Sequence, residues 1–388
     1  MSELGMGFEV ESFEGDKLIL NMGPQHPSTH GVLRLILTIS GENIIDCKPD
    51  IGFLHRGVEK LCEHLNYVQI PPILERNDYL SPISNALCFV LALEKAGNVE
   101  VPRRAKYIRT LLAEISRITS HMIAIGTYGL DLGGALGGGT SVFMRAFRIR
   151  EFGLALMEEF TGTRFHLNAV QIGGVRYDIP SSEWITKAKK FCELAEKFIY
   201  DELIPLVEKN PTFRARTIGV GILPPDIAKL YGCSGPVLRG SGIAYDVRKA
   251  EPYDAYGELD FNVIIQNGCD CYSRWMVRGL EVIESVKIIR QVIDGIPSGP
   301  ISSRPPLKAP VAFKPPENVE VYSRVESPRG EMGAFIVSDN TTKPYRLKLR
   351  SPSFSNLSVL PFLVKNVKIP DVIAILGSLD PVFGDVDR

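Results

Sequence analysis

The stretch that decides the fold class is PRRAKYIRTLLAEISRITSHMIAIGTY, residues Pro102–Tyr128. Its apolar residues recur roughly every three to four positions, which is the period of a helix that buries one face. Pro102 suits the first turn of such a helix, because the backbone N–H that proline lacks would have no partner there. The sequence therefore predicts one long helix.

The same helical period appears in other stretches after Arg56. Five further helices are predicted, at Val58–Val68, Tyr79–Ala96, Ser141–Thr161, Ser182–Lys209 and Cys271–Gly295. Six helices of this kind indicate a helical bundle as the main core. Residues 211–270 are rich in Gly, Pro and Tyr, which predicts mostly irregular structure with one short helix at Pro225–Leu230.

Segments with strand character precede and follow these helices. We expect six strands, at Lys17–Asn21, Val32–Ser40, Asn43–Lys48, Val319–Val325, Gly333–Ser338 and Tyr345–Arg350. The predicted fold class is α+β, with three parts along the chain. Residues 1–55 form an N-terminal antiparallel β region, residues 56–295 a helical bundle core, and residues 296–388 a Pro-rich connection with a small C-terminal β and extended region.

Composition excludes several classes of protein. A hydrophobic fraction of 45% is ample for sizeable cores, and a net charge of -1 leaves no basic excess that would attract nucleic acid. Seven scattered cysteines, an odd number, indicate reduced intracellular thiols rather than a disulfide framework. The acidic start of the chain is unlike a signal peptide, and the longest apolar run, Ala86–Leu93, is too short to span a bilayer.

The loop GPQHPSTHG, Gly23–Gly31, holds two of the six histidines in a segment that two prolines stiffen and glycines close. A stiff loop can present an imidazole at little entropic cost. His26 and His30 have His-x-x-x-His spacing, but a metal site would also need a helix or a third ligand, and neither is evident. A histidine together with a tyrosine in an apolar pocket suits a quinone, whose two carbonyl oxygens each need a donor.

The candidate tyrosine is Tyr79, which follows the charged residues Glu75, Arg76 and Asp78 at the start of a strongly apolar helix. Taken alone, such a tyrosine is more often an aromatic residue at the edge of the core. Asp131 interrupts apolar sequence at the end of the third predicted helix, and a carboxylate in such surroundings needs a partner, for which a charged histidine is suitable.

Two patterns are rejected as sites. The Gly-rich stretch Gly134–Ser141 has the length of a phosphate-binding loop, but Thr140 stands where the lysine belongs and a helix precedes it instead of a strand. The pair Cys269-x-Cys271 lacks the further cysteines that an iron–sulfur cluster or structural zinc requires.

Several blocks of sequence, in this order, resemble the hydrogenase-like quinone-site subunit of respiratory complex I, the NADH:quinone oxidoreductase. The resemblance runs from about Leu18 to Arg388, and the blocks are Gly23–Gly31, Ile51–Lys60, Arg164–His166, Ile172–Val175, Tyr245–Lys249 and Gly377–Arg388. It implies that His30 and Tyr79 bracket the quinone headgroup and that Asp131 pairs with His30. It further implies that Arg56 and His166 lie near the terminal iron–sulfur cluster of a neighbouring small subunit.

The same resemblance implies where the redox groups lie. This chain would ligate no cofactor or metal, quinone would be its substrate, and the iron–sulfur clusters, FMN and NADH would belong to partner subunits. The partners implied are the iron–sulfur small subunit, other peripheral-arm subunits, and a membrane-arm subunit where quinone enters. The chain would lie on the cytoplasmic face of the inner membrane, or on the equivalent matrix face, without a transmembrane segment.

The family is in turn similar to the large subunit of nickel–iron hydrogenases, whose metal is held by two Cys-x-x-Cys pairs. The corresponding stretches here, Leu54–Lys60 and Asp380–Asp385, contain no cysteine, so thiolate ligands for nickel are missing. The chain also departs from the family in the Gly-rich segment Gly133–Thr140, next to Asp131. Two alternatives stay open, a hydrogenase large-subunit-type protein and a non-catalytic assembly scaffold of a redox complex.

Overall fold

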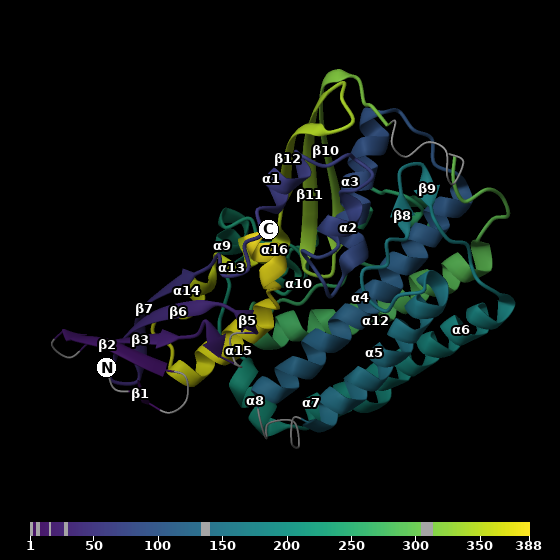
Figure 1. Cartoon of the computed structure of the whole chain (residues 1–388). Coiled ribbons are helices and arrows are strands. Elements are labelled where there is room, and N and C mark those ends of the chain that lie inside the picture. Colours follow the sequence, from purple (N-terminus) through teal and green to yellow (C-terminus); the bar gives the residue numbers. More distant parts are fainter. Residues whose placement is uncertain (1–2, 5–7, 15–16, 27–29, 133–139, 304–312) are drawn as a thin grey trace.

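The computed structural model describes residues 3–4, 8–14, 17–26, 30–132, 140–303 and 313–388. Four long helices lie side by side in the body of the molecule (Figure 1). They are α4 (Arg103–Asp131), α5 (Thr140–Thr161), α6 (Ser182–Lys197) and α12 (Cys271–Gly295). The predicted α+β class with a helical bundle core and two β regions is confirmed.

Three predicted helices are shorter than expected or interrupted. The first, α1, is shorter than expected (Val58–Cys62), because the chain turns so that the N–H of Tyr67 donates to the carbonyl of Thr342. Helix α3 (Pro82–Ala96) begins after Tyr79, because the Asp78 carboxylate accepts the N–H groups of Leu80 and Ser81 in a turn before it.

The predicted helix at 182–209 is interrupted. After α6 the chain forms a π-helical segment, Phe198–Leu203, and then α7, Ile204–Glu208. Pro205 lies just beyond the π-helical segment and has no backbone N–H to donate to the preceding turn. The helix therefore changes its hydrogen-bond pattern at this point.

The N-terminal sheet has the strand order β1-β2-β3-β6-β7 with antiparallel pairing, and it projects from one side of the molecule (Figure 1). Three strands lie close to their predicted positions, β3 (Lys17–Met22), β6 (Arg34–Ser40) and β7 (Asn43–Asp50). The strands β1 (Glu3–Leu4) and β2 (Phe8–Glu14) were not predicted. A register shift between Val10 and Ser12 breaks the alternation that would have revealed β2.

Two very short strands, β4 (Gln25–His26) and β5 (Gly31–Val32), pair with each other and close the His-containing loop into a hairpin. Residues 27–29 between them lie outside the described residues. The C-terminal sheet is formed by β10 (Glu317–Ser327), β11 (Gly330–Asp339) and β12 (Pro344–Arg350), which confirms all three predicted strands. Helix α3 packs against β10 and β11.

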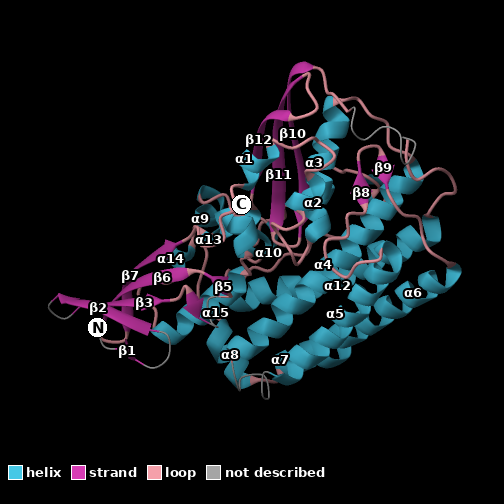
Figure 2. Ribbon diagram, in the orientation of Figure 1, coloured by secondary structure: helices cyan, strands magenta, loops and turns pink. Residues whose placement is uncertain are grey.

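The chain after Arg350 was expected to be extended, and this is wrong. It forms four helices, α13 (Pro352–Leu357), α14 (Leu360–Leu363), α15 (Ile369–Leu379) and α16 (Phe383–Asp387). Ser351 caps α13 by accepting the N–H of Phe354, and α15 buries an almost wholly apolar sequence. These helices bring the C-terminus back to the centre of the molecule (Figure 2).

The segment at 211–270 also has more regular structure than expected. The predicted helix α9 (Pro225–Leu230) is confirmed, and further short elements surround it. These short elements are α8 (Pro211–Thr217), α10 (Gly235–Arg239), α11 (Val247–Ala250) and the 3-10 turn Tyr256–Glu258. Three further short elements lie between α1 and α6, namely α2 (Pro71–Leu74), β8 (Val170–Gln171) and β9 (Gly174–Val175).

Buried apolar side chains from all three predicted parts of the chain belong to one cluster, for example Leu35, Leu111 and Leu376. The division at residues 55 and 295 stays a prediction. Among the described residues, no helix is both long and apolar enough to cross a membrane.

Two buried helical glycines give a test of the bundle packing. A Cβ on Gly153 of α5 would lie 2.4 Å from Thr119 Cγ2 of α4, whereas a Cβ on Gly279 of α12 would meet only Leu203 Cδ2 at 3.9 Å. We predict that Gly153→Ala destabilises the fold by about 1–3 kcal/mol through overpacking. Gly279→Ala should instead stabilise it, by up to about 1 kcal/mol, through helix propensity. Thermal unfolding of both variants checks this, and a loss of stability from both would contradict it.

Candidate functional site

His30 lies in the hairpin between β4 and β5 and has a left-handed backbone conformation, with φ 59°. Gly31 follows with φ 142°, and a Cβ there would lie 2.7 Å from the ring of Phe383 in α16. Only glycine allows this close approach of the hairpin to the C-terminal helix. The C-terminal helices therefore help to fix the position of His30.

Asp131 is the last helical residue of α4, and its Oδ2 lies 2.6 Å from His30 Nε2. Both side chains are largely buried, with relative exposures of 16% and 12%. At this distance the two groups form an ion pair when the imidazole is protonated. The pairing that the resemblance implied is present.

Helix α15 packs directly behind this pair. A Cβ on Gly377 would lie 2.9 Å from Asp131 Oδ2 and 3.2 Å from His30 Nε2. The ring of Tyr128 is equally close to that position, at 2.9 Å. A side chain at Gly377 would therefore force the imidazole and the carboxylate apart.

His30, Tyr79 and Asp131 share one cavity of about 500 Å³. The three residues come from the β hairpin, from the segment before α3, and from the end of α4. The other residues that line the cavity are mainly apolar and are Leu80, Ile123, Thr127, Leu130, Asp380, Pro381 and Val382. The three predicted site residues are thus brought together around one cavity.

Tyr79 does not begin a helix as expected, but lies two residues before the N-cap Ser81 of α3. Its side chain is partly exposed, at 37%. Burial raises the pKa of the Tyr79 phenol, and the neighbouring Asp78 carboxylate adds to the rise. The phenol therefore keeps its proton and can donate it in a hydrogen bond at neutral pH.

The charge on His30 results from opposing effects. Burial lowers the pKa of the imidazole, but the contact with Asp131 and the charges of Asp131 and Asp380 outweigh this effect. The net pKa of His30 lies above its ordinary value of 6.5. The pair can thus hold an imidazolium beside a carboxylate, which makes His30 a charged donor.

Asp380 is a cavity residue that the sequence analysis did not select. It ends α15 in a left-handed conformation, with φ 54°, and its carboxylate lies 3.3 Å from Arg329 Nε and 3.7 Å from Arg278 Nε. Arg329 also pairs with Asp78 at 3.3 Å and donates to Ser120. A signal was available, because Asp380 interrupts the apolar sequence of the C-terminal block.

Arg56 and His166 do not line the cavity and lie elsewhere. Arg56 Nη2 donates to Asn77 Oδ1 at 2.7 Å. Burial lowers the pKa of His166, and the charges of Arg76 and Arg56 add to the decrease. His166 is therefore a largely neutral imidazole beside two arginines.

Glu75 lies near His166 and was not selected as a candidate in the sequence analysis. Both of its carboxylate oxygens accept the N–H of Asn168, at 2.9 and 3.0 Å. Burial raises the pKa of Glu75 to about 7, which the N–H of Asn168 and the charges of Arg76 and Arg176 only partly offset. A buried carboxyl group that titrates near neutral pH thus lies next to the His166 loop.

The structure describes one of the two rejected patterns, the Gly-rich stretch, only in part. Within the described ranges, no group of three or more His, Cys, Asp or Glu side chains is arranged to hold a metal ion. Cys271 is buried beside Arg274, with Sγ 3.3 Å from Nη2, whereas Cys269 is partly exposed. Most of the Gly-rich stretch 134–141, and the departure at 133–140, lie outside the described residues.

The comparisons with known proteins identify the family. The family model of the respiratory-chain NADH dehydrogenase 49 Kd subunit matches residues 137–388. A D-type NADH-quinone oxidoreductase subunit of Symbiobacterium thermophilum is 44% identical, and the match covers 96% of this chain and 98% of that protein. The D-type NADH-quinone oxidoreductase subunit of Pelodictyon phaeoclathratiforme is 45% identical, over 96% of this chain and 92% of that protein.

The chain belongs to the family of the respiratory-chain NADH dehydrogenase 49 Kd subunit.

Membership of the 49 Kd family confirms the resemblance found in the sequence. A third relative, a D-type NADH-quinone oxidoreductase subunit of Rhizobium etli strain CIAT 652, is 43% identical over 98% of both proteins. The family model begins after His30, Tyr79 and Asp131, but the matches to whole relatives cover nearly the entire chain. The likeness to the 49 Kd family therefore extends to the N-terminal β region as well as the helical bundle.

The raised pKa of His30 predicts a pH dependence of stability. Its ion pair contributes fully below pH 6.5, and the contribution is lost as pH rises through the higher pKa of the folded state. We predict that Asp131→Asn lowers the unfolding temperature more at about pH 6 than at about pH 9. In a His30→Gln background, this pH dependence of the Asp131→Asn effect should disappear. Thermal unfolding at both pH values is the measurement, and an unchanged dependence without His30 would refute the assignment.

Proposed function

We propose that this chain forms the quinone reduction site of a proton-pumping NADH:quinone oxidoreductase, together with a partner iron–sulfur subunit. The observation that carries the proposal is the cavity of about 500 Å³, on which a His30–Asp131 pair and the Tyr79 phenol converge. A quinone headgroup is an apolar ring with two carbonyl oxygens, and it needs a donor at each oxygen. The names of the relatives, which are subunits of NADH-quinone oxidoreductases, support this choice of substrate.

The reduction requires two electrons and two protons for each quinone. The electrons reach the ring from the partner's cluster, and the protons come from His30 and Tyr79, one to each oxygen. His30 is suited as a proton donor because its imidazolium is stabilised by Asp131, while Tyr79 keeps its phenol proton. This chain positions the ring and supplies protons, and the redox groups of its partners carry the electrons.

The second group of polar residues suits the boundary with that partner. Arg56, Arg76, His166 and Glu75 lie together and apart from the cavity. Exposed apolar side chains accompany them in sequence, at Ile51, Phe53 and Phe165. We propose that this surface faces the iron–sulfur small subunit, where cationic and titratable groups tune the potential of the terminal cluster. Clusters, FMN and the NADH site belong to partner subunits in this proposal.

Proton release at the cavity offers a route to energy coupling. When His30 gives up its proton, Asp131 loses its cationic partner and becomes an uncompensated buried charge. Such a charge favours rearrangement of the elements that hold it. We propose that this is the signal passed to the membrane subunits that translocate protons. The chain would then act as a peripheral subunit, beside the membrane subunit through which quinone enters, and only as part of the assembled complex.

Two other functions are distinguishable from this one. A nickel–iron hydrogenase would need thiolate ligands that the stretches 54–60 and 380–385 do not contain, and stoichiometric nickel in the purified complex would favour it. A non-catalytic scaffold would not need a charge pair and a phenol on one cavity. Binding of a quinone analogue that is lost in His30→Ala would exclude the scaffold function.

Replacement of Tyr79 by phenylalanine tests the assignment of the phenol. The substitution removes one O–H group at the cavity and leaves the ring, so we predict that quinone reduction falls about a hundredfold. Reduction of the partner's clusters by NADH should keep its rate, since no electron donor is changed. Tyr345→Phe is the matched control, because Tyr345 is 69% exposed and does not line the cavity. Unchanged quinone turnover in Tyr79→Phe would remove Tyr79 from the mechanism.

Replacement of Asp131 by asparagine tests the coupling. Asparagine is similar in size but carries no charge, so loss of the His30 proton would no longer create a buried anion. We predict that the variant complex, in membrane vesicles, pumps fewer protons per NADH oxidised in the turnover that remains. The measurement is the ratio of proton translocation to NADH oxidation, which is independent of the overall rate. Full stoichiometry in the variant would exclude the proposed signal.

A further inference from the structure

Arg278 is a buried cation whose role is not explained by the fold. It lies on α12, is 2% exposed, and its Nη1 donates to the carbonyl of Arg274 at 2.9 Å. Its Nε and Nη2 atoms have no hydrogen-bond partner among the described residues. The carboxylate paired with it is that of Asp380, whose Oδ2 lies 3.7 Å from Nε. Burial of a charge with so few hydrogen bonds is costly, which points to a role other than stability.

Asp380 connects this arginine to the cavity. The residue lines the cavity with His30, and its negative charge acts on the imidazole in the same direction as that of Asp131. Arg329 also contacts Asp380 but is shared, because it pairs with Asp78 and donates to Ser120. Arg278 is the less constrained of the two arginines at Asp380.

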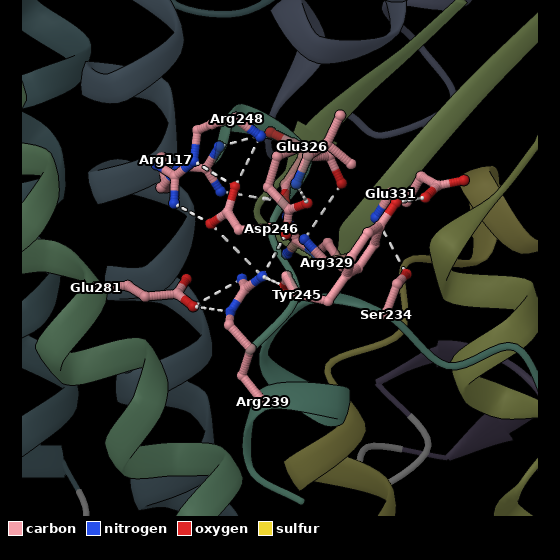
Figure 3. A network of polar contacts seen from close by, with 12 residues as sticks. Arg117, Ser234, Arg239, Tyr245, Asp246, Arg248, Glu281, Glu326, Arg329 and Glu331 are labelled. Atoms are coloured by element: carbon pink, nitrogen blue, oxygen red, sulfur yellow. Dashed lines mark hydrogen bonds and ion pairs between the residues drawn. The ribbon is translucent and has the colours of Figure 1, made fainter. Parts of the chain in front are cut away.

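On its other side Arg278 faces a large ionic network in the interior. The charge of Glu281, one turn further along α12, acts on Arg278 together with that of Asp380. Glu281 accepts from Arg239 Nε at 2.8 Å and contacts His121 Nε2 at 3.0 Å. Figure 3 shows how Arg239 joins Glu281 to further buried carboxylates of this network. Arg278 thus lies between the anion at the cavity and a network of fixed charges.

We propose that Arg278 is a positioning residue of the quinone site, which compensates the charge of Asp380 and thereby sets the proton affinity of His30. The role of Arg278 deepens the proposed function and rests on it for the nature of the substrate. With Arg278 in place, the effect of the Asp380 charge on His30 is partly compensated. Without Arg278, Asp380 acts more strongly on the imidazolium, and His30 holds its proton more tightly.

The direction of the effect follows from the groups that face His30. Asp131 on α4 and Asp380 after α15 are the anions, while Tyr79 and Tyr128 are phenols whose pKa values are raised by burial and therefore stay neutral. Loss of a cation near Asp380 strengthens the total negative field at the imidazole. The pKa of His30 then rises, because an imidazolium is favoured by nearby negative charge.

The test is the pH dependence of quinone reduction by the assembled complex. The rate should fall as pH rises through the pKa of His30, and this fall forms the alkaline limb of the pH profile. Arg278→Gln should move the alkaline limb to higher pH by about one unit. Arg278→Lys keeps the charge and should return the limb toward the wild-type position. Arg290→Gln is the matched control on the same helix, since Arg290 pairs with Glu196 away from the cavity, and it should leave the limb unchanged.

A second pair of variants keeps the proposal testable even if Arg278→Gln does not assemble. Asp380→Asn removes the anion that Arg278 compensates, so adding Arg278→Gln to it should cause no further shift of the limb. A further shift of the limb in the double variant, or an unmoved limb in Arg278→Gln alone, would overturn the proposal.

The proposed function can fail separately. If His30 is not the proton donor, the alkaline limb should be unaffected by His30→Gln, whatever Arg278 does. The pH-dependent part of the Asp131→Asn effect on unfolding reports the pKa of His30 without quinone. The pH range over which this effect is lost should shift upward in Arg278→Gln even if His30 is not the proton donor to quinone. The absence of such a shift would by itself overturn the inference.

Discussion

The ion pair between His30 and Asp131 is the contact on which the arrangement of the site depends. It joins a hairpin near the N-terminus to the end of the longest bundle helix, and α15 closes behind it at Gly377. The hairpin, the end of α4 and α15 are distant in sequence and must therefore pack in direct contact here. The pair is buried, and a buried pair is stabilising only while both charges are present. Its protonation is consequently linked to the packing of the hairpin against the helices.

The fold can hold these charges because the interior around them is already ionic. Buried arginines such as Arg239 and Arg248 each pair with buried carboxylates, and Figure 3 shows their contacts converging between α12, α4 and β10. Fixed dipoles and charges of this kind do not need to reorganise when a proton leaves the cavity. The network explains how Asp380 and Arg329 can be buried next to the cavity. Among the described residues, the ionisable groups that reach the cavity itself are those of His30, Asp131, Tyr79 and Asp380.

The sequence predicted the long elements well, because their periodicity extends over many residues. Helix α12 begins and ends where its pattern does, and the six predicted strands are present. One error arises where a tertiary contact overrides the local pattern, at Tyr67, whose N–H donates to a distant connection between strands. Other errors arise in the C-terminal helices, some of which are too short to show a helical period. His30, Tyr79 and Asp131, which the sequence analysis selected, line one cavity, but Asp380 and Arg278 were not selected, since their roles depend on contacts between helices.

The segment Glu75–Tyr79 shows why part of the site could not be helical. Glu75 accepts the N–H of Asn168 beside His166, Asn77 accepts from Arg56, and Asp78 pairs with Arg329 below the cavity that Tyr79 lines. A Cβ on Gly384 would lie 2.5 Å from the carbonyl of Asn77, so α16 holds this segment in place. Successive residues thus contact the proposed cluster-facing surface and the proposed quinone cavity in turn. A regular helix would direct the side chains of five successive residues to only part of these contacts. The irregular segment lets one short stretch contact both the proposed cluster-facing surface and the proposed quinone cavity.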